Sequence, residues 1–221
     1  MKILALELSS AQGSLALLNG GEVAVNREWP NDRKNSGPFF EHLAEVQGRF
    51  GKPDVIIVGL GPGSYAGTRI AISAAIGLSF GGTDSAPSDE QIQLMGRHRG
   101  RPSVRLIGYP SICAIECGVS EYCVIGDARR QSFFFSRTRE SSLIEGPTLM
   151  SEAELREKLD KVDKKMSIFA TERLSQFERA EVRYPTAKVL GQIANDRMRN
   201  FVQPPLEPIY LREPHITIPK K

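Results

Sequence analysis

The 221-residue chain has no long apolar run and contains few cysteines, histidines and tryptophans. It has three cysteines, three histidines and one tryptophan, and it lacks a run of about 18 apolar residues, the length that a membrane-spanning helix needs. The start, MKILALELSS, has only four consecutive apolar residues, fewer than the apolar core of a secretion signal. These absences argue against membrane insertion and secretion, and we expect a cytoplasmic protein.

Metal and thiol chemistry also lack their usual residue patterns. His42, His98 and His215 are scattered, and no pair of histidines is spaced to place two imidazoles on one helix face. Cys113 and Cys117 are four residues apart and would share a helix face, but no further ligand lies nearby at a suitable spacing. Buried structural cysteines are the favoured interpretation, and we predict no metal and no cofactor.

The charge balance decides little about partners. The net charge is +3 and the isoelectric point is near 8.8, which permits an anionic partner such as RNA without indicating a dedicated nucleic-acid binder. A hydrophobic content of 40% over 221 residues is enough to bury a core in one large domain or in two lobes.

Apolar runs and turns in the first part of the chain predict an α/β unit. Residues 2–30 alternate apolar runs with turns, one of them Gly-Gly, which predicts three antiparallel strands. A helical repeat of apolar residues follows over 36–50, then a fully apolar strand over 54–60 and a helix of small residues over 68–80. The expected order is βββαβα.

This order nearly repeats after residue 120. Ser151 precedes Glu154 by three residues, the pattern of a capping box at a helix start. The segments that predict the repeat are three strands, a helix, a strand and a closing helix: EYCVIGDAR, QSFFFSRT, LIEGPTLM, the helix from Ser151, MSIFA and TAKVLGQIANDRMRNF. We predict two tandem βββαβα lobes, residues 1–119 and residues 120–221.

A long segment with no clear periodicity, residues 81–105, separates the two halves and is rich in Gly, Pro, Ser and charge. Its arginines are Arg97, Arg99, Arg101 and Arg105. A surface insertion and an RNA-contacting segment are both consistent with this composition.

The sequence GLGPGSYAGTR, residues 59–69, resembles a phosphate-binding loop but fails both standard patterns. It lacks the lysine that follows the last glycine of a P-loop, and its glycines do not have the dinucleotide-binding spacing. Two interpretations remain for Gly61, Pro62, Gly63 and Ser64. They form an anion-binding helix start assisted by Arg69, or they form a tight turn that lets the following helix pack closely.

No self-sufficient active site is present in the sequence. The G-x-S-x-G motif of a serine nucleophile is absent. Asp127, Arg129 and Arg130 follow an apolar strand and form the most conspicuous polar group, although an ordinary turn with solvated arginines explains them equally. Tyr210 and Arg212 near the C-terminus form a similar group, for which an edge strand with a solvated arginine is the alternative interpretation.

Five segments resemble the bacterial TsaB (YeaZ) family in order and approximate spacing: ILALELSSAQGSLALL, GLGPGSYAGTRIAISAAIGL, GYPSICAI, VIGDARRQSFFFS and PIYLRE. The resemblance covers most of the chain except the segment between the halves. It implies a duplicated actin-like, ribonuclease H-like (ASKHA) α/β fold. It also implies a non-catalytic subunit of the complex that makes threonylcarbamoyladenosine in tRNA, in a family once described as glycoproteases.

The same resemblance implies partners and sites. The partners are a catalytic TsaD-type paralogue and a TsaE-type ATPase, with tRNA bound through the complex and a homodimer as an alternative state. The implied partner interface comprises Phe39, Phe40, Leu43, Ala71, Ala74 and Ala75. Asp127, Arg129 and Arg130 would mark the cleft between the lobes.

The chain departs from the family pattern where a nucleotide site would need it most. Glu7-Leu8-Ser9 replaces the usual Asp-Thr-Ser at the end of the first strand, and Asn35 precedes Ser36 where a histidine is usual. An enzyme with weak ATPase, kinase or peptidase-like activity is the alternative hypothesis. Kinase chemistry needs acidic magnesium ligands on the first strand, and this segment supplies them poorly.

Overall fold

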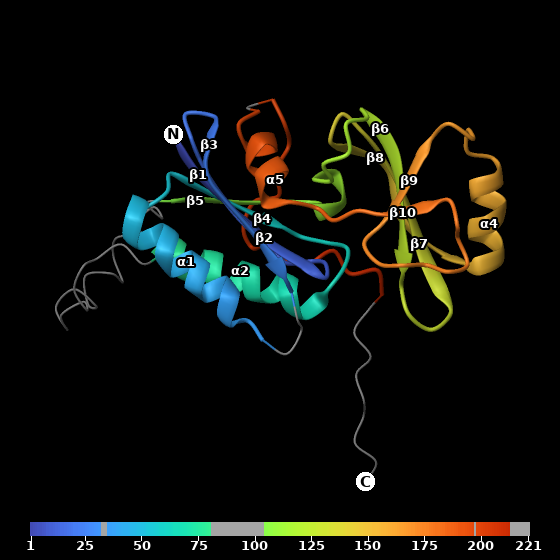
Figure 1. Cartoon of the computed structure of the whole chain (residues 1–221), viewed down its shortest axis with the longest axis horizontal. Coiled ribbons are helices and arrows are strands. Elements are labelled where there is room, and N and C mark those ends of the chain that lie inside the picture. Colours follow the sequence, from blue (N-terminus) through green and yellow to red (C-terminus); the bar gives the residue numbers. More distant parts are fainter. Residues whose placement is uncertain (32–34, 81–103, 197, 213–221) are drawn as a thin grey trace, which may run out of the picture.

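The computed structural model describes residues 1–31, 35–80, 104–196 and 198–212, which form two lobes (Figure 1). The first lobe contains β1 (Lys2–Glu7), β2 (Gln12–Asn19), β3 (Glu22–Pro30), α1 (Gly37–Phe50), β4 (Val55–Gly59), α2 (Tyr65–Phe80), β5 (Arg105–Tyr109) and the short 3-10 helix η1 (Ser111–Cys113). The second contains β6 (Glu121–Asp127), β7 (Ser132–Arg139), β8 (Ser142–Ser151), α4 (Glu152–Asp160), β9 (Ser167–Ala170) and β10 (Ala180–Val182). Helix α5 (Ala187–Ala194) follows.

The two sheets have the same connectivity. The first has the strand order β3-β2-β1-β4-β5 and the second β8-β7-β6-β9-β10. In each sheet the first strand pairs antiparallel with the second and parallel with the fourth. The prediction of a duplicated α/β fold of the actin-like type is therefore confirmed.

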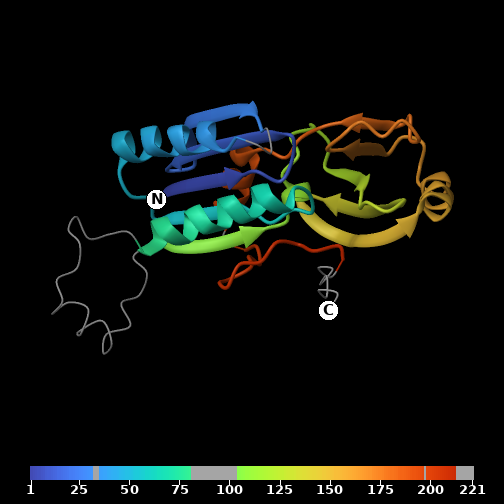
Figure 2. The same cartoon turned by 90° about the horizontal axis from the view of Figure 1, so that it is seen from below.

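The first sheet is covered by helices on both faces. Alternate residues of a strand point to opposite faces, so Leu4 and Leu6 of β1 share a core with α1 and α2, whereas Ile3 and Ala5 pack with α5. Figures 1 and 2 show α1 and α2 on one face of this sheet, and Figure 1 shows α5 on the other. Both faces of the sheet are thereby buried.

The second sheet also uses both faces, but one of them faces the first lobe. Phe135 of β7 packs beneath Leu155 of α4, which begins with the predicted capping box at Ser151. On the opposite face Val124 and Phe134 join the same buried core as η1 and α5. The lobes are therefore joined by a continuous apolar core.

Helix α5 lies against the first sheet, although the sequence places it after the strands of the second. The Ala187 backbone N–H donates to Ser14 Oγ at 2.8 Å, and a Cβ on Gly191 would lie 2.3 Å from Leu18 Cδ1. The helix ends at Ala194, earlier than the predicted segment. Strand β10 was not predicted, because its three residues are too short to show a pattern.

Some predictions concern residues outside the described ranges. Arg97, Arg99 and Arg101 of the segment between the halves lie there, as does His98. In the described part of the chain, no helix combines the length and apolar character that crossing a membrane requires.

Candidate functional site

The glycine loop between β4 and α2 brings the start of α2 against the segment that follows β1. A Cβ on Gly63 would lie 2.1 Å from the carbonyl oxygen of Ser9, and one on Gly67 would lie 2.0 Å from that of Leu8. The Ser64 backbone N–H donates to the Ser9 carbonyl oxygen at 2.6 Å. Only glycine allows this approach of two backbones, which favours the close-packing interpretation of the loop.

The base of the loop is fixed from below. The Gly61 N–H donates to Ser111 Oγ at 2.9 Å, and the Ser111 N–H donates to the Gly61 carbonyl oxygen at 2.8 Å. Gly61 and Pro62 are buried, while Gly63 is exposed and Ser64 is half-buried. A cavity lies between the two lobes. Of the predicted loop residues, only Gly63 and Ser64 line it.

Arg69 is not directed at this loop. Its Nη1 donates to Tyr65 Oη at 2.8 Å, and its guanidinium carbon lies 5.1 Å from the centre of the Tyr65 ring. It does not line the cavity. Its predicted role in binding an anion stays a prediction.

Glu7, at the end of β1, is fully buried beside the loop. Its Oε1 accepts from the Ser9 N–H at 2.6 Å, and a Cβ on Gly59 would lie 1.7 Å from its Oε2 and 2.6 Å from Ser111 Oγ. Burial raises the pKa of the Glu7 carboxyl, while the hydrogen bond from the Ser9 N–H opposes this rise; Oε2 has no hydrogen-bond partner among the described residues. The carboxyl group supports the loop from inside the core and does not line the cavity.

The hairpin between β6 and β7 closes the cavity from the second lobe. Asp127 Oδ1 accepts from the Arg129 N–H at 2.6 Å, and Oδ2 accepts from Arg129 Nη1 at 3.3 Å. Arg129, Arg130 and Gln131 have φ angles of 65°, 53° and 57°. Asp127 therefore holds a turn whose backbone is in the left-handed region, in which residues other than glycine are uncommon.

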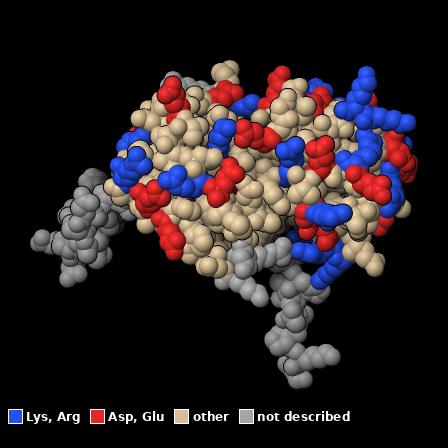
Figure 3. Space-filling view, viewed as in Figure 1, with Lys and Arg blue, Asp and Glu red and all other residues tan. Residues whose placement is uncertain are grey.

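These segments enclose a cavity of about 290 Å³ between the lobes. Two of the three predicted cleft residues, Asp127 and Arg129, line this cavity. Arg130 is exposed and does not line it. Tyr210 and Arg212, the two candidate residues near the C-terminus, line it as well, together with their neighbours Pro208, Ile209 and Leu211. Over the face in Figure 3, acidic and basic side chains are interspersed, without a broad field of one sign.

Reactive groups are sparse in the described ranges. No three His, Cys, Asp or Glu side chains of residues 1–31, 35–80, 104–196 and 198–212 gather in a way that would hold a metal ion. Burial raises the pKa of the Cys113 thiol to about 12, so this cysteine stays protonated at neutral pH.

The outer surface of α2 is the second candidate site. Its exposed residues are Tyr65, Ala66, Arg69, Ser73, Ile76, Gly77 and Phe80. Arg69 is the only charged residue of the whole helix, and the Phe80 side chain is 76% exposed. A helix on the surface of a globular protein normally has a polar outer face, so this composition is typical of a contact surface.

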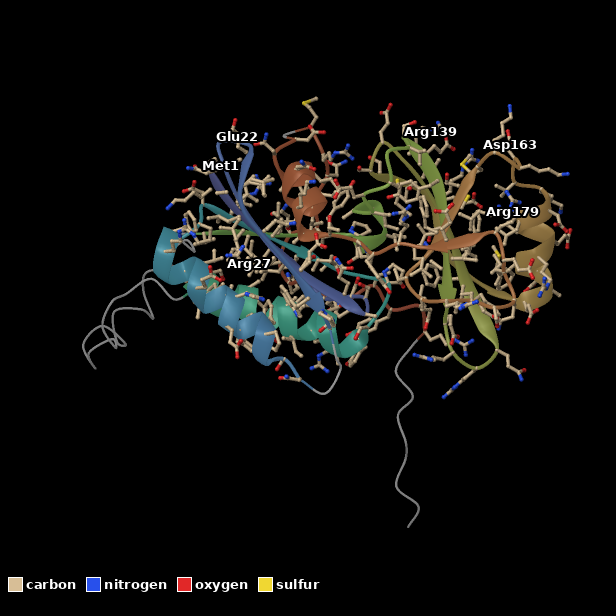
Figure 4. All side chains as sticks on the ribbon, in the orientation of Figure 1. Met1, Glu22, Arg27, Arg139, Asp163 and Arg179 are labelled. Carbon is tan, nitrogen blue, oxygen red and sulfur yellow. The ribbon has the colours of Figure 1, made fainter. Side chains whose placement is uncertain are left out.

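The neighbouring helix α1 has a different outer face. Its Glu45 pairs with Arg27 of β3 at 2.8 Å, and Figure 4 shows Arg27 over this helix. Phe40 is its exposed apolar residue, with 49% of its surface accessible. The other exposed residues of α1 are small, polar or charged, so the helix adds one large apolar side chain, Phe40, to this surface.

Four of the six predicted interface residues are buried within the chain itself. Phe39 and Leu43 of α1 and Ala71 and Ala75 of α2 face the first sheet. Phe40 is exposed and Ala74 is half-buried. The prediction chose the apolar stripe of each helix, which is the stripe that a helix turns toward its own core. The interface itself stays a prediction.

The arrangement of strands and helices is similar to that of two solved structures. A crystal structure from Pseudomonas aeruginosa, described as an uncharacterized protein with similarity to peptidase YeaZ, matches with a TM-score of 0.67 and 19% identity over 96% of this chain and 99% of the other. The chain has the YeaZ fold. YeaZ from the same organism matches with a TM-score of 0.60 and 18% identity, over 88% of this chain and 90% of that one. No family model and no curated protein matches the sequence.

Proposed function

We propose that this chain is a TsaB-type subunit of the apparatus that adds threonylcarbamoyl to adenosine in tRNA. In this role it binds and activates a catalytic TsaD-type paralogue through α2 and Phe40 of α1. The TsaE-type ATPase and the tRNA join through the complex. The observation that carries the proposal is the exposed, almost uncharged face of α2 on a chain that matches the YeaZ fold over 96% of its length.

The alternative, an actin-like enzyme, is less well supported. Kinase chemistry needs acidic magnesium ligands on the first strand, whereas the carboxylates that line the cavity, Asp127 and Glu172, belong to the second lobe. Glu7, the acidic residue of the first strand, points into the core beside Gly59 and Ser111. Calorimetric titration with ATP and magnesium separates the two hypotheses, because tight binding with turnover would favour the enzyme.

Purification with the paralogue from the same organism tests the proposal directly. Ile76→Arg places a charge on the outer face of α2, and Ile144→Arg makes the same change on β8 of the second lobe. The two isoleucines are 39% and 46% exposed, so they form a matched pair. We expect Ile76→Arg to weaken the complex at least about tenfold, as for a residue central to an interface, and Ile144→Arg to leave it unchanged.

Light scattering on the chain without the paralogue measures its mass in solution and therefore tests the homodimer alternative separately. A wild-type chain that fails to associate with the paralogue would contradict the proposal. Equal binding by both variants would show that α2 is not the contact surface.

A further inference from the structure

The segment after α5 returns along the first lobe before it reaches the cavity. Val202 exchanges two backbone hydrogen bonds with Gly108 of β5, at 2.9 and 3.0 Å. Leu206 is buried in the core beneath α1 and α2, and the Ile209 N–H donates to the Leu60 carbonyl oxygen at 2.8 Å. Figure 2 shows this segment running from beside β5 toward the second lobe.

The last described residues contact one motif in each lobe. The Tyr210 ring lies 5.5 Å from the ring of Tyr65, the first residue of α2, with the planes inclined at 44°. Arg212 Nη2 donates to Ser132 Oγ, at the start of β7, at 2.5 Å. Two residues apart in sequence, Tyr210 and Arg212 thus reach the first turn of α2 and the hairpin held by Asp127.

A separate set of contacts joins the lobes away from the cavity. Arg199 Nη1 donates to Ser142 Oγ at 2.7 Å and to Tyr109 Oη at 3.4 Å, and Nη2 donates to the Glu140 carbonyl oxygen at 2.6 Å. Its partners belong to β5, to the turn after β7 and to the first residue of β8. Contacts near Arg199 can therefore stay intact when those near Arg212 are removed.

We propose that residues 206–212 form a strap that holds the 127–132 hairpin of the second lobe against the first turn of α2. The strap fixes the N-terminal end of the surface through which α2 would contact a partner. The mechanical part of this inference stands without the proposed function, and its effect on partner affinity rests on it.

Hydrogen–deuterium exchange on the full chain tests the strap in the double variant Tyr210→Ala, Arg212→Ala. We expect peptides over 62–70 and 127–133 to exchange about tenfold faster, the order of effect of losing a hydrogen bond to a charged group. Peptides over β1, β2 and residues 140–142 should exchange as in the wild type. Arg139→Ala is the matched control, because Arg139 lies at the other end of β7 in an exposed pair with Glu121.

Unchanged exchange in both motifs would overturn the proposal. Faster exchange spread evenly over all peptides would overturn it too, because the segment would then support the whole fold rather than join two motifs. Arg212→Met keeps the aliphatic packing and removes the donor, and it should loosen only 127–133, so this variant decides the question if the double variant does not fold.

Affinity for the paralogue separates the two parts of the inference. Faster exchange over 62–70 and 127–133 with unchanged affinity for the paralogue would support the strap as a link between the lobes. The same result would overturn its influence on the partner surface. A wild-type chain that does not bind the paralogue would overturn the proposed function, while the exchange data would still decide the strap.

Discussion

The two lobes end their first strands with a carboxylate, and the two carboxylates lie in opposite surroundings. Glu7 of β1 is fully buried beside Gly59 and Ser111. Asp127 of β6 lines the cavity, and its side chain is 31% exposed and pairs with Arg129. The same strand position thus serves as an internal support in one lobe and as a turn-forming group in the other.

The helices differ in the same way. Between its fourth and fifth strands the first sheet has α2, whereas residues 171–179 join β9 to β10 without a helix. Helix α4 exposes charged residues, including the pair of Arg156 with Glu152, while α2 has an almost uncharged outer face. Duplication preserved the sheets, and the lobes diverged in what surrounds them.

Gly59→Ala should have the largest effect on stability, because it places a Cβ against the buried Glu7 carboxylate. The added Cβ would lie 1.7 Å from a carboxylate oxygen of Glu7, and both Glu7 and Ser111 are fully buried, so the Cβ can be accommodated only by a shift of core side chains. We expect a loss of about 3 kcal/mol of unfolding free energy. Thermal unfolding measures it.

Gly77→Ala serves as the control, since nothing lies within 4 Å of a Cβ added at this helical position. It should stabilise the chain by up to about 1 kcal/mol. A Gly59→Ala variant that unfolds like the wild type would mean that Glu7 does not occupy this space.

Glu7→Gln should change how stability depends on pH. The folded-state pKa of Glu7 is raised, so its contribution to stability is complete below the ordinary value of 4.5 and is lost as pH rises through the folded-state pKa. Glutamine keeps an acceptor for the Ser9 N–H and carries no charge. We expect the variant to gain about 1 kcal/mol or more over the wild type at pH 8 relative to pH 4.

Denaturant titrations at the two pH values measure this difference. Asp127→Asn is the comparison in the second lobe and should change stability by less than about 0.5 kcal/mol, because it removes only a partly exposed ion pair. If both variants changed the unfolding free energy equally between the two pH values, the contrast between a buried Glu7 and a partly exposed Asp127 would be contradicted.

The smallest expected effect on stability concerns the N-terminal caps of α4 and α1. Ser151 Oγ accepts from the Glu154 N–H at 3.3 Å at the start of α4, whereas Ser36 makes no side-chain capping bond at the start of α1. Ser151→Ala should cost about 1 kcal/mol, and Ser36→Ala a few tenths at most. Chemical unfolding of both variants checks the difference, and equal losses would contradict it.

Local patterns were enough to predict most of the elements. The alternating runs in residues 2–30 form β1 to β3, the capping box opens α4, and the small residues after the glycine loop form α2. These signals depend on neighbouring residues, so they can be recognised along the chain. Less of the cavity lining could be predicted, because Arg69 stacks on Tyr65 and Arg130 is exposed, and neither of them lines the cavity.

The sequence by itself determined most of the order of strands and helices and the duplicated α/β class, because these follow from periodicity. It left two interpretations for the glycine loop, and the close approach of its backbone to Leu8 and Ser9 came from the tertiary structure. Only the tertiary structure decided that α5 covers the first sheet, that Glu7 is buried, and that Tyr210 and Arg212 reach two lobes. Each of these depends on contacts between residues far apart in the chain, and no local pattern encodes which distant surface a segment will meet.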